Sequence, residues 1–336
     1  MSDQKPPVMK SVFVSGGSGF VGRNLIRALV ARGASVKALA RSPTAIAQVQ
    51  VAGAVAVPGD LGDEAALRAG MEGCDTVFHA AAIVSDWGKR EEFYDSTVRG
   101  TQNMLFAARM ARVGCFVHVG TEAVLAGGQK IINADETTPY PASPVGLYPW
   151  SKMLAEQAVV AANVEGFRTL SVRPRFIWGG DDSSLLPQLA DAMRKGQWVW
   201  FGGARHKMST CHVANVVEGT LLAAQFGKGG EIYFLTDGAP VVFREFITKM
   251  MQTQGIVPPD REMPLWVAKL LAAVGESVWR IFGLPGRPPI TRTMVNLLFD
   301  EVTVNDRKAC ETIFYRGAMT IDQGMADLAA RHKKEK

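Results

Sequence analysis

The sequence predicts an α/β fold: a doubly wound parallel sheet with a smaller C-terminal lobe. Two observations carry this prediction. Short apolar runs alternate with longer amphipathic segments through the first half of the chain, and a glycine-rich turn follows the first apolar run. Near-continuous apolar strands separated by helices are typical of a parallel sheet covered on both faces. After about residue 174 the alternation loosens, which is where a less regular lobe is expected.

Each element follows from its local pattern. The apolar runs predict strands over 12–14, 36–40, 54–57, 76–82, 116–120 and 170–173. In the first helix, over 21–32, Leu25 and Leu29 share one face, and Gly33 is placed to end it. Asp63 caps a short helix that ends near Gly70. Further helices are predicted over about 91–111 and 145–162.

Composition and charge narrow the class of protein. The chain has 336 residues, of which 47% are hydrophobic and 21% charged, so a disordered chain is excluded. The net charge of +5 is not gathered into a basic stripe, so no nucleic-acid partner is expected. The four cysteines are far apart and the five histidines show no ligand spacing, so neither a disulfide framework nor a metal site is predicted. Residues 1–7 lack an apolar core and no charge-free window of 18 residues occurs, so a cytoplasmic location is expected.

The glycine-rich turn has the spacing of a dinucleotide site. Gly16, Gly19 and Gly22 lie between the first strand and the first helix. Glycine is needed where the chain turns with positive φ and where backbone approaches a pyrophosphate, and the free N–H groups at Phe20 and Val21 would face it. Residues 1–174 are therefore predicted to form a Rossmann-type dinucleotide-binding lobe.

Arg41 points to the form of the cofactor. An acid that binds the ribose 2′-OH is usual at the end of the second strand, but the sequence there reads Ala40-Arg41-Ser42. A guanidinium suits a 2′-phosphate, which favours NADP(H) over NAD(H), although a solvated arginine is the simpler alternative. Asp60, followed by Leu61, could accept from the adenine amino group or only close a turn.

Tyr148 and Lys152 form a Y-x-x-x-K motif. Residues i and i+4 share one face of a helix, so the ammonium is expected beside the phenol. A nearby positive charge would lower the tyrosine pKa from about 10 and make it usable as an acid or base near neutrality. Of the five tyrosines, only Tyr148 has lysine at this spacing.

Together, the glycine turn, the fifth strand ending at Thr121, and the Tyr148/Lys152 helix resemble the extended short-chain dehydrogenases/reductases. Three further strings, 120–124, 173–179 and 288–293, resemble the 3β-hydroxysteroid dehydrogenase-like group, which includes bacterial reductases of branched 3-ketoacids. The resemblance implies an NAD(P)-dependent oxidoreductase with Tyr148 as acid/base, Lys152 bound to the nicotinamide ribose, and Ala80, Ala81 and Pro174 at the cofactor.

Two positions depart from that family's pattern. A Ser/Thr pair is usual at the end of the fifth strand, but here it reads Thr121-Glu122, so Thr121 is assigned the hydrogen bond to the substrate oxygen. Glu122 is a candidate second acid/base at the substrate, although an exposed loop carboxylate is the preferred interpretation. Thr97 replaces the asparagine that often precedes Val-x-Gly-Thr, which puts a proton relay through that residue in doubt.

Residues 175–336 are predicted to form mainly the substrate lobe, with segments of about 205–236 completing the sheet. In the helix over 264–282 the only charges are Lys269, Glu276 and Arg280, which lie on one narrow stripe. The remaining apolar circumference predicts a helix buried against the sheet lobe, a lid over an apolar substrate, or peripheral contact with a membrane. Trp198 and Trp200 are expected near the cleft or in the core.

This lobe favours a hydrophobic substrate whose 3-hydroxy and 3-keto groups are interconverted, sterol-like or a long-chain β-keto acid. Arg175 and Arg292 are candidates for holding a substrate carboxylate, and Trp178 is a candidate substrate contact. The alternatives are a nucleotide-sugar epimerase or dehydratase with bound NAD, and a cofactor-sensing protein without turnover. A homodimer is left open.

Overall fold

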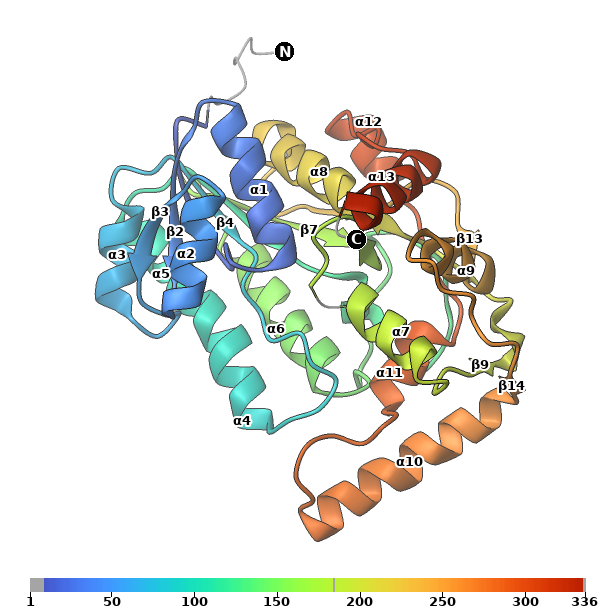
Figure 1. The fold of residues 1–336 in the computed structure, drawn as a ribbon. Helices are drawn as coiled ribbons and strands as arrows, with labels where there is room; N and C mark the ends of the chain where they lie inside the picture. The colour runs from blue at the N-terminus through green and yellow to red at the C-terminus, as the bar shows by residue number, and fades with distance from the viewer. Residues whose placement is uncertain (1–8, 184, 335–336) are drawn as a thin grey trace.

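A computed structural model describes residues 9–183 and 185–334, and the predicted absence of an apolar core in residues 1–7 lies outside that range. Among the described residues, seven parallel strands form the main sheet, in the order β12-β7-β5-β4-β1-β2-β3 (Figure 1). The strands are β1 (Ser11–Ser15), β2 (Ser35–Ala40), β3 (Val55–Pro58), β4 (Thr76–His79), β5 (Cys115–Val119), β7 (Arg168–Pro174) and β12 (Ile232–Leu235). The strand order reverses between β1 and β4, where the open crevice of such sheets lies. The predicted α/β class is confirmed.

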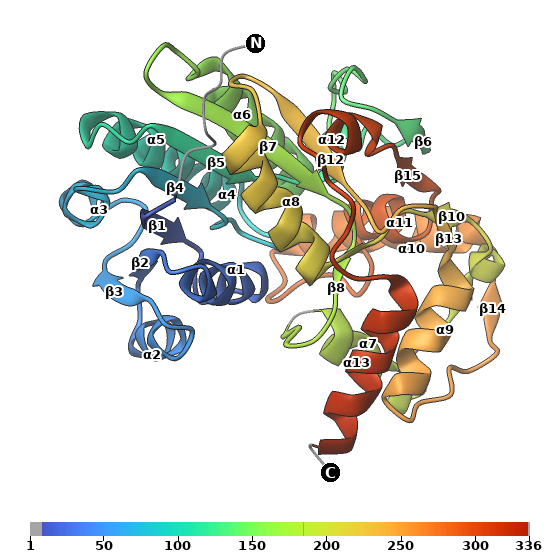
Figure 2. The same ribbon diagram turned by 90° about the horizontal axis from the view of Figure 1, so that it is seen from above.

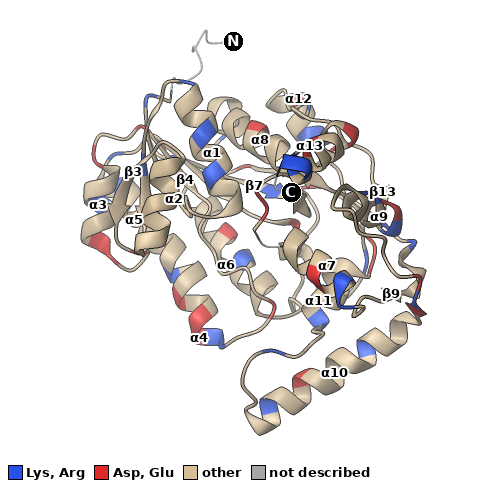
Figure 3. Cartoon of the chain, in the orientation of Figure 1, with Lys and Arg blue, Asp and Glu red and all other residues tan. Residues whose placement is uncertain are grey.

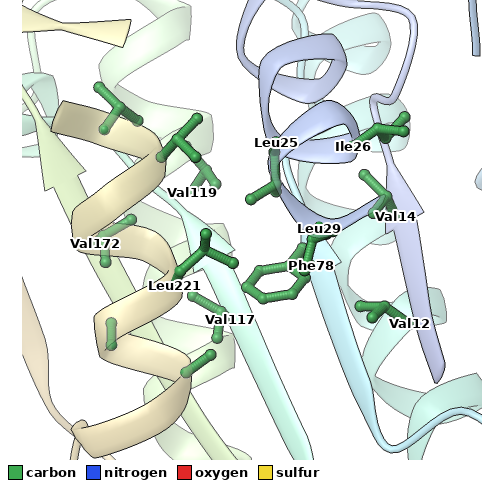
Figure 4. Close-up of a cluster of buried hydrophobic side chains, with 14 of the residues drawn as sticks. Val12, Val14, Leu25, Ile26, Leu29, Phe78, Val117, Val119, Val172 and Leu221 are labelled. Carbon is green, nitrogen blue, oxygen red and sulfur yellow. The ribbon is translucent and has the colours of Figure 1, made fainter. Parts of the chain in front are cut away.

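Helices cover both faces of this sheet, as the view from above shows (Figure 2). One face carries α1 (Phe20–Ala31), α2 (Pro43–Val51) and α8 (Val213–Phe226), and the other carries α3 (Glu64–Met71), α5 (Gly100–Met110) and α6 (Leu147–Ala161). Between α1, α8 and the strands, Leu25, Leu29, Phe78 and Leu221 are buried in one cluster (Figure 4). This apolar layer holds the strand ends in place, and the site is built on those strand ends.

The structure adds two features that the sequence patterns did not predict. Helix α2 begins directly after β2, where Ser42 accepts a hydrogen bond from Ala45 N and Pro43 occupies the first helical position. The single helix expected over 91–111 is divided into α4 (Arg90–Phe93), a π-helical segment (Tyr94–Arg99) and α5. Such π-helical segments are common near functional sites.

The second lobe has its own core and little regular sheet. Its helices are α7 (Leu185–Arg194), α9 (Phe243–Thr253), α10 (Leu265–Phe282), α11 (Arg292–Leu298) and α13 (Ile321–Lys334), whereas α12 (Arg307–Thr312) packs against β12 of the main sheet. Short strands from both halves of the chain join beside them: β6 (Ile131–Ala134), β8 (Ile177–Trp178), β9 (Trp200–Phe201), β10 (Lys207–Met208), β11 (Cys211–His212), β13 (Val241–Val242), β14 (Glu262–Met263) and β15 (Val302–Val304). Trp178, Trp198 and Trp200 are all buried in this core, so the two tryptophans at 198 and 200 are core residues.

Helix α10 lies on the outside of the molecule, against α11 and away from the sheet (Figure 1). The predicted burial of its apolar face is wrong, because Trp266, Leu270 and Val274 are each more than half exposed. The opposite side, with Ala268 and Ala272, is buried instead. No helix in the described part of the chain is long and apolar enough to cross a membrane.

Candidate active site

The glycine turn is shaped by close backbone approach. Gly16 has φ +70°, and a Cβ atom there would lie 2.6 Å from the backbone nitrogen of Ala81 at the end of β4. A Cβ on Gly22 would overlap the carbonyl oxygen of Gly16. No acid occupies the first turn of α1, so the N–H groups of that turn can face an anion. The two glycines let the turn pack against the end of β4 and against itself, and the free N–H groups of this turn fit the pyrophosphate of a dinucleotide.

The residues predicted for the adenosine end lie at the ends of β2 and β3. Arg41 is exposed and directly follows β2. Asp60 Oδ1 accepts a hydrogen bond of 2.8 Å from Gly62 N, so this carboxylate closes a turn in the structure. Leu61 packs against Gly100 of α5, whose lack of a side chain makes room for it. The carboxyl ends of parallel strands meet at one edge, so these residues share that edge with the glycine turn.

Tyr148 lies in the first turn of α6 and meets the end of β5 at Thr121. The Thr121 hydroxyl hydrogen bonds with Tyr148, and it donates to Glu122 Oε2 at 2.9 Å. Burial raises the pKa of Tyr148 to about 12, and the hydrogen bond with Thr121 opposes that rise. The tyrosine is therefore protonated across the physiological range.

Lys152 does not lower the Tyr148 pKa as the sequence spacing predicted. Its ammonium turns toward β5, where it donates to the Val119 carbonyl at 2.9 Å and contacts His118 Nε2 at 3.0 Å. Tyr148 lies in the first turn of α6, and the charges that act on it are those of Glu122 and Arg175. Burial lowers the pKa of Lys152 to about 8.

Glu122 is not the exposed loop carboxylate that the sequence favoured. Its side chain is buried, and Oε1 lies 3.2 Å from Arg175 Nη1, which is also buried. Arg175 in addition donates to the Leu297 carbonyl. The arginine expected to bind a substrate carboxylate thus already has a carboxylate partner inside the protein.

The other predicted substrate and cofactor residues are divided between site and core. Pro174 ends β7 and is buried beside the end of β5. The prediction of Trp178 as a substrate contact is not supported, since it is 1% exposed and donates its indole N–H to Asp237 at 2.7 Å. Arg292 begins α11, is half exposed, and lies 3.8 Å from Glu276.

Sequence reasoning missed a buried polar cluster beneath Lys152. Ser171 donates to Glu156 Oε2 at 2.9 Å and contacts His118 Nδ1 at 3.1 Å. Glu156 binds Arg173 through both carboxylate oxygens, and all four side chains are buried. The sequence signal for this cluster is that Ser171 and Arg173, two polar residues at alternate positions, share one face of a buried strand.

The chain is similar to known oxidoreductases. A model of the 3-beta hydroxysteroid dehydrogenase/isomerase family matches residues 13–265. The 4-hydroxy-2-methyl-3-oxo-4-farnesyl-3,4-dihydroquinoline-1-oxide ketoreductase of Stigmatella aurantiaca is 51% identical over 313 residues, covering 93% of this chain and 94% of the relative. The decarboxylating sterol-4-alpha-carboxylate 3-dehydrogenase of Dictyostelium discoideum is 33% identical, covering 95% of this chain and all of the relative.

Solved structures show the same fold. The crystal structure of gox2253 superposes with a TM-score of 0.79 and 26% identity, covering 97% of this chain and 98% of that one. The UDP-glucose 4-epimerase of Thermotoga maritima has a TM-score of 0.76 but only 16% identity, so it shows the fold alone. The family predicted from the sequence is confirmed. The chain belongs to the 3-beta hydroxysteroid dehydrogenase/isomerase family of extended short-chain dehydrogenases/reductases and is an NAD(P)-dependent oxidoreductase.

Proposed function

We propose that the protein is an NADPH-dependent ketoreductase for a bulky, uncharged, hydrophobic ketone. The observation that carries this proposal is the state of Tyr148. Burial raises its pKa to about 12, so at working pH it holds the proton that a reduced ketone oxygen must receive. A protonated Tyr148 can serve as the acid of ketone reduction, the reaction for which the Stigmatella aurantiaca ketoreductase is named.

The ion pair of Glu122 and Arg175 supports an uncharged substrate. The two charges neutralise each other in a buried position beside Thr121 and Tyr148. A substrate carboxylate there would lie beside the Glu122 carboxylate, and Arg175 is already paired with Glu122. Placing two carboxylates together in a desolvated site is energetically costly. The Stigmatella aurantiaca relative is named for a farnesylated dihydroquinoline oxide, and we extend that class, a ring ketone with an isoprenoid chain, to this protein.

Each residue then has a defined task. The turn of Gly16, Gly19 and Gly22 holds the pyrophosphate, and a bound nicotinamide cofactor supplies the hydride. Tyr148 gives its proton to the substrate oxygen, and Thr121 donates to the same oxygen once its hydroxyl turns away from Glu122. Lys152 keeps a positive charge below the site that can restore the tyrosine proton. The proposed cofactor contacts are Gly16, Gly19, Phe20, Val21, Gly22, Arg41, Leu61, Ala80, Ala81, Tyr148, Lys152 and Pro174.

A ketone panel tests the substrate class. Purified protein and NADPH should oxidise the cofactor with prenylated or polycyclic uncharged ketones, and more slowly with β-keto acids of matched length. The measurement is the loss of absorbance of reduced cofactor. Turnover of β-keto acids alone would overturn the uncharged class, and turnover of nucleotide sugars alone would overturn the ketoreductase proposal.

Arg41 is proposed to bind the 2′-phosphate of NADPH. It is exposed at the end of β2, where an acid would select NADH. Replacing Arg41 with Ala is expected to lower kcat/KM with NADPH by roughly 10- to 100-fold, the value of a hydrogen bond to a charged group, and to change kcat/KM with NADH by less than about threefold. Lys37→Ala, another cation on β2, is the matched control. Equal losses with both cofactors would contradict this role.

We further propose that α10 rests on a membrane surface, from which a hydrophobic substrate can enter. Trp266, Leu270 and Val274 are 65, 53 and 53% exposed and form one stripe along the helix. Ala268, Ala272 and Glu276 lie on the opposite side, where Glu276 accepts a hydrogen bond from Arg292 N at 2.7 Å. The two alanines and this hydrogen bond hold that side of the helix against the protein, so the large apolar side chains face outward.

Charge supports a lipid occupant for this stripe. Lys269 and Arg280 lie along one edge of it and are each more than half exposed, and they are paired with Asp300 at 3.3 Å and with the buried Glu276 at 3.7 Å (Figure 3). An apolar helix face edged by cations is typical of a helix lying in the interface of an anionic bilayer.

Vesicle binding tests this surface. Replacing Trp266, Leu270 and Val274 together with Ser should lower cosedimentation with phosphatidylcholine/phosphatidylglycerol vesicles at least about tenfold, because each large side chain contributes about 1.5–3 kcal/mol on burial. Val257→Ser, which alters a still more exposed apolar residue outside α10, should leave binding unchanged. If the triple variant binds vesicles as well as the wild type does, the stripe is not a lipid-binding surface. If the wild-type protein is a dimer that the same substitutions dissociate, the stripe is a dimer interface instead.

A further inference from the structure

We propose that His118 is a positioning residue that anchors the Lys152 ammonium. The inference rests on the proposed role of Lys152 beneath Tyr148. His118 lies on β5, three residues before Thr121, and is buried. Among the described residues, Thr97 makes no hydrogen bond with Lys152, whereas His118 Nε2 lies 3.0 Å from Lys152 Nζ.

The hydrogen bonds around His118 have only one consistent direction. An ammonium group only donates, so Nε2 must accept from Lys152. Nδ1 then carries the ring proton and donates to Ser171 Oγ, 3.1 Å away. Ser171 in turn donates to Glu156 Oε2 at 2.9 Å. The tautomer of His118 is therefore set by its neighbours on both sides, and every polar atom of the ring has a partner.

The chain ends in a fixed charge. Glu156 is held by two hydrogen bonds from Arg173 Nε and one from Arg173 Nη2, and it also accepts from the Tyr140 hydroxyl at 2.9 Å. Lys152, His118, Ser171 and Glu156 thus form a continuous path from the catalytic lysine to an ion pair between α6 and β7. This path can hold the lysine rigidly through protein side chains alone.

The charged and titratable groups that face His118 come from three elements. His79 on β4 lies with its ring centroid 5.7 Å from that of His118, Lys152 and Glu156 lie on α6, and Arg173 lies on β7. Burial and, after it, the charge of Lys152 hold the pKa of His118 well below its usual range, so the ring is neutral and free to accept.

His79 provides an internal comparison. Ser15 Oγ lies 2.6 Å from its Nδ1, and Thr101 Oγ1 lies 2.8 Å from its Nε2. Thr101 gives its own proton to the Thr97 carbonyl at 2.6 Å, so it accepts from Nε2, and His79 carries its proton there. Two equally buried histidines on neighbouring strands are thus expected to hold opposite tautomers.

The first test uses the unaltered protein and needs no substrate. Nitrogen-15 NMR of labelled histidines should show His118 protonated on Nδ1 and His79 protonated on Nε2. Single-site variants assign the two rings. An Nε2 proton on His118 would remove the acceptor for Lys152 and overturn the inference, whatever substrate the enzyme uses.

The second test uses His118→Leu, with His118→Gln as the conservative variant that keeps an acceptor for the ammonium. Without an acceptor the charged form of the buried Lys152 is less stable, so the pKa of Lys152 falls. The alkaline limb of kcat should therefore shift to lower pH by about one to two units. The glutamine variant should restore most of that shift.

His79→Leu is the matched control, because it removes an equally buried histidine that does not touch Lys152. It should leave the alkaline limb where it is, even if the protein melts at a lower temperature. The inference is overturned if the alkaline limb of kcat does not shift in a folded His118→Leu variant, or if it shifts equally in His79→Leu.

Discussion

Replacing Tyr148 with Phe is expected to lower kcat for ketone reduction by about 10²–10⁴-fold, the usual contribution of a general acid. The substitution keeps the ring and removes only the hydroxyl that bonds with Thr121. Because the glycine turn is untouched and Tyr148 is one of several proposed cofactor contacts, the Kd for NADPH, measured by fluorescence titration, should rise by at most about tenfold, the value of one hydrogen bond.

Tyr233→Phe is the matched control for that substitution. Tyr233 lies on the edge strand β12, far from the site, and its buried hydroxyl accepts from Lys228 N, so kcat should stay within about twofold. If Tyr148→Phe retains more than a tenth of the wild-type kcat, another group donates the proton, and Glu122 becomes the first to examine.

The wild-type enzyme should also show a defined pH dependence. Burial lowers the pKa of Lys152 from 10.5 to about 8, so its positive charge is present below that pH and is lost as the pH rises through it. Tyr148, with a pKa of about 12, remains protonated over the same range. We therefore expect kcat to be level up to about pH 7.5 and to fall above about pH 8.

The second large effect is expected on stability. Replacing Glu156 with Leu leaves Arg173 buried without a counter-ion, and breaking a buried pair in this way costs about 3–5 kcal/mol. The same variant removes the acceptor of Ser171 and of the Tyr140 hydroxyl. Urea unfolding followed by circular dichroism should show the midpoint moving to lower denaturant.

The double variant Glu156→Leu/Arg173→Leu separates charge from packing. Replacing both members of a buried pair with apolar residues is often nearly neutral, so the double variant should be more stable than the single one. A single variant within about 1 kcal/mol of wild type would show that the pair adds little to folding.

The sequence predicted the architecture well, because its signals are local. Strand bounds and the first, third and sixth helices follow from apolar periodicity, and the structure places them within a few residues of expectation. Helix α2 was missed although Ser42-Pro43 is a helix-start signal, since no apolar period follows it. Gly22 has a local requirement, because a Cβ there would meet the backbone of Gly16, whereas Gly16 is also constrained by Ala81 at the end of β4.

The candidate site could be predicted only in part. Tyr148 and Thr121 are brought together as expected, because one begins α6 and the other ends β5. The i, i+4 rule correctly placed Lys152 on the same helix face but could not say where a long, flexible side chain finds its partner. Burial of Glu122 and of Trp178 was also beyond a one-dimensional pattern, since both depend on segments from the second lobe and the sheet.

The sequence alone therefore determined the fold, the family, the glycine turn and the Tyr148/Lys152 motif, since all of these are encoded in residues close together in the chain. Only the tertiary structure decided which charges are paired and which faces are exposed. Lys152 contacts His118, which is 34 residues away in the chain, and Glu122 pairs with Arg175, which follows the neighbouring strand of the sheet. Glu276 accepts a hydrogen bond from the start of α11, and this contact leaves the apolar side of α10 facing outward. Such pairings depend on desolvation and on distance in space, and neither can be read from the order of residues in the chain.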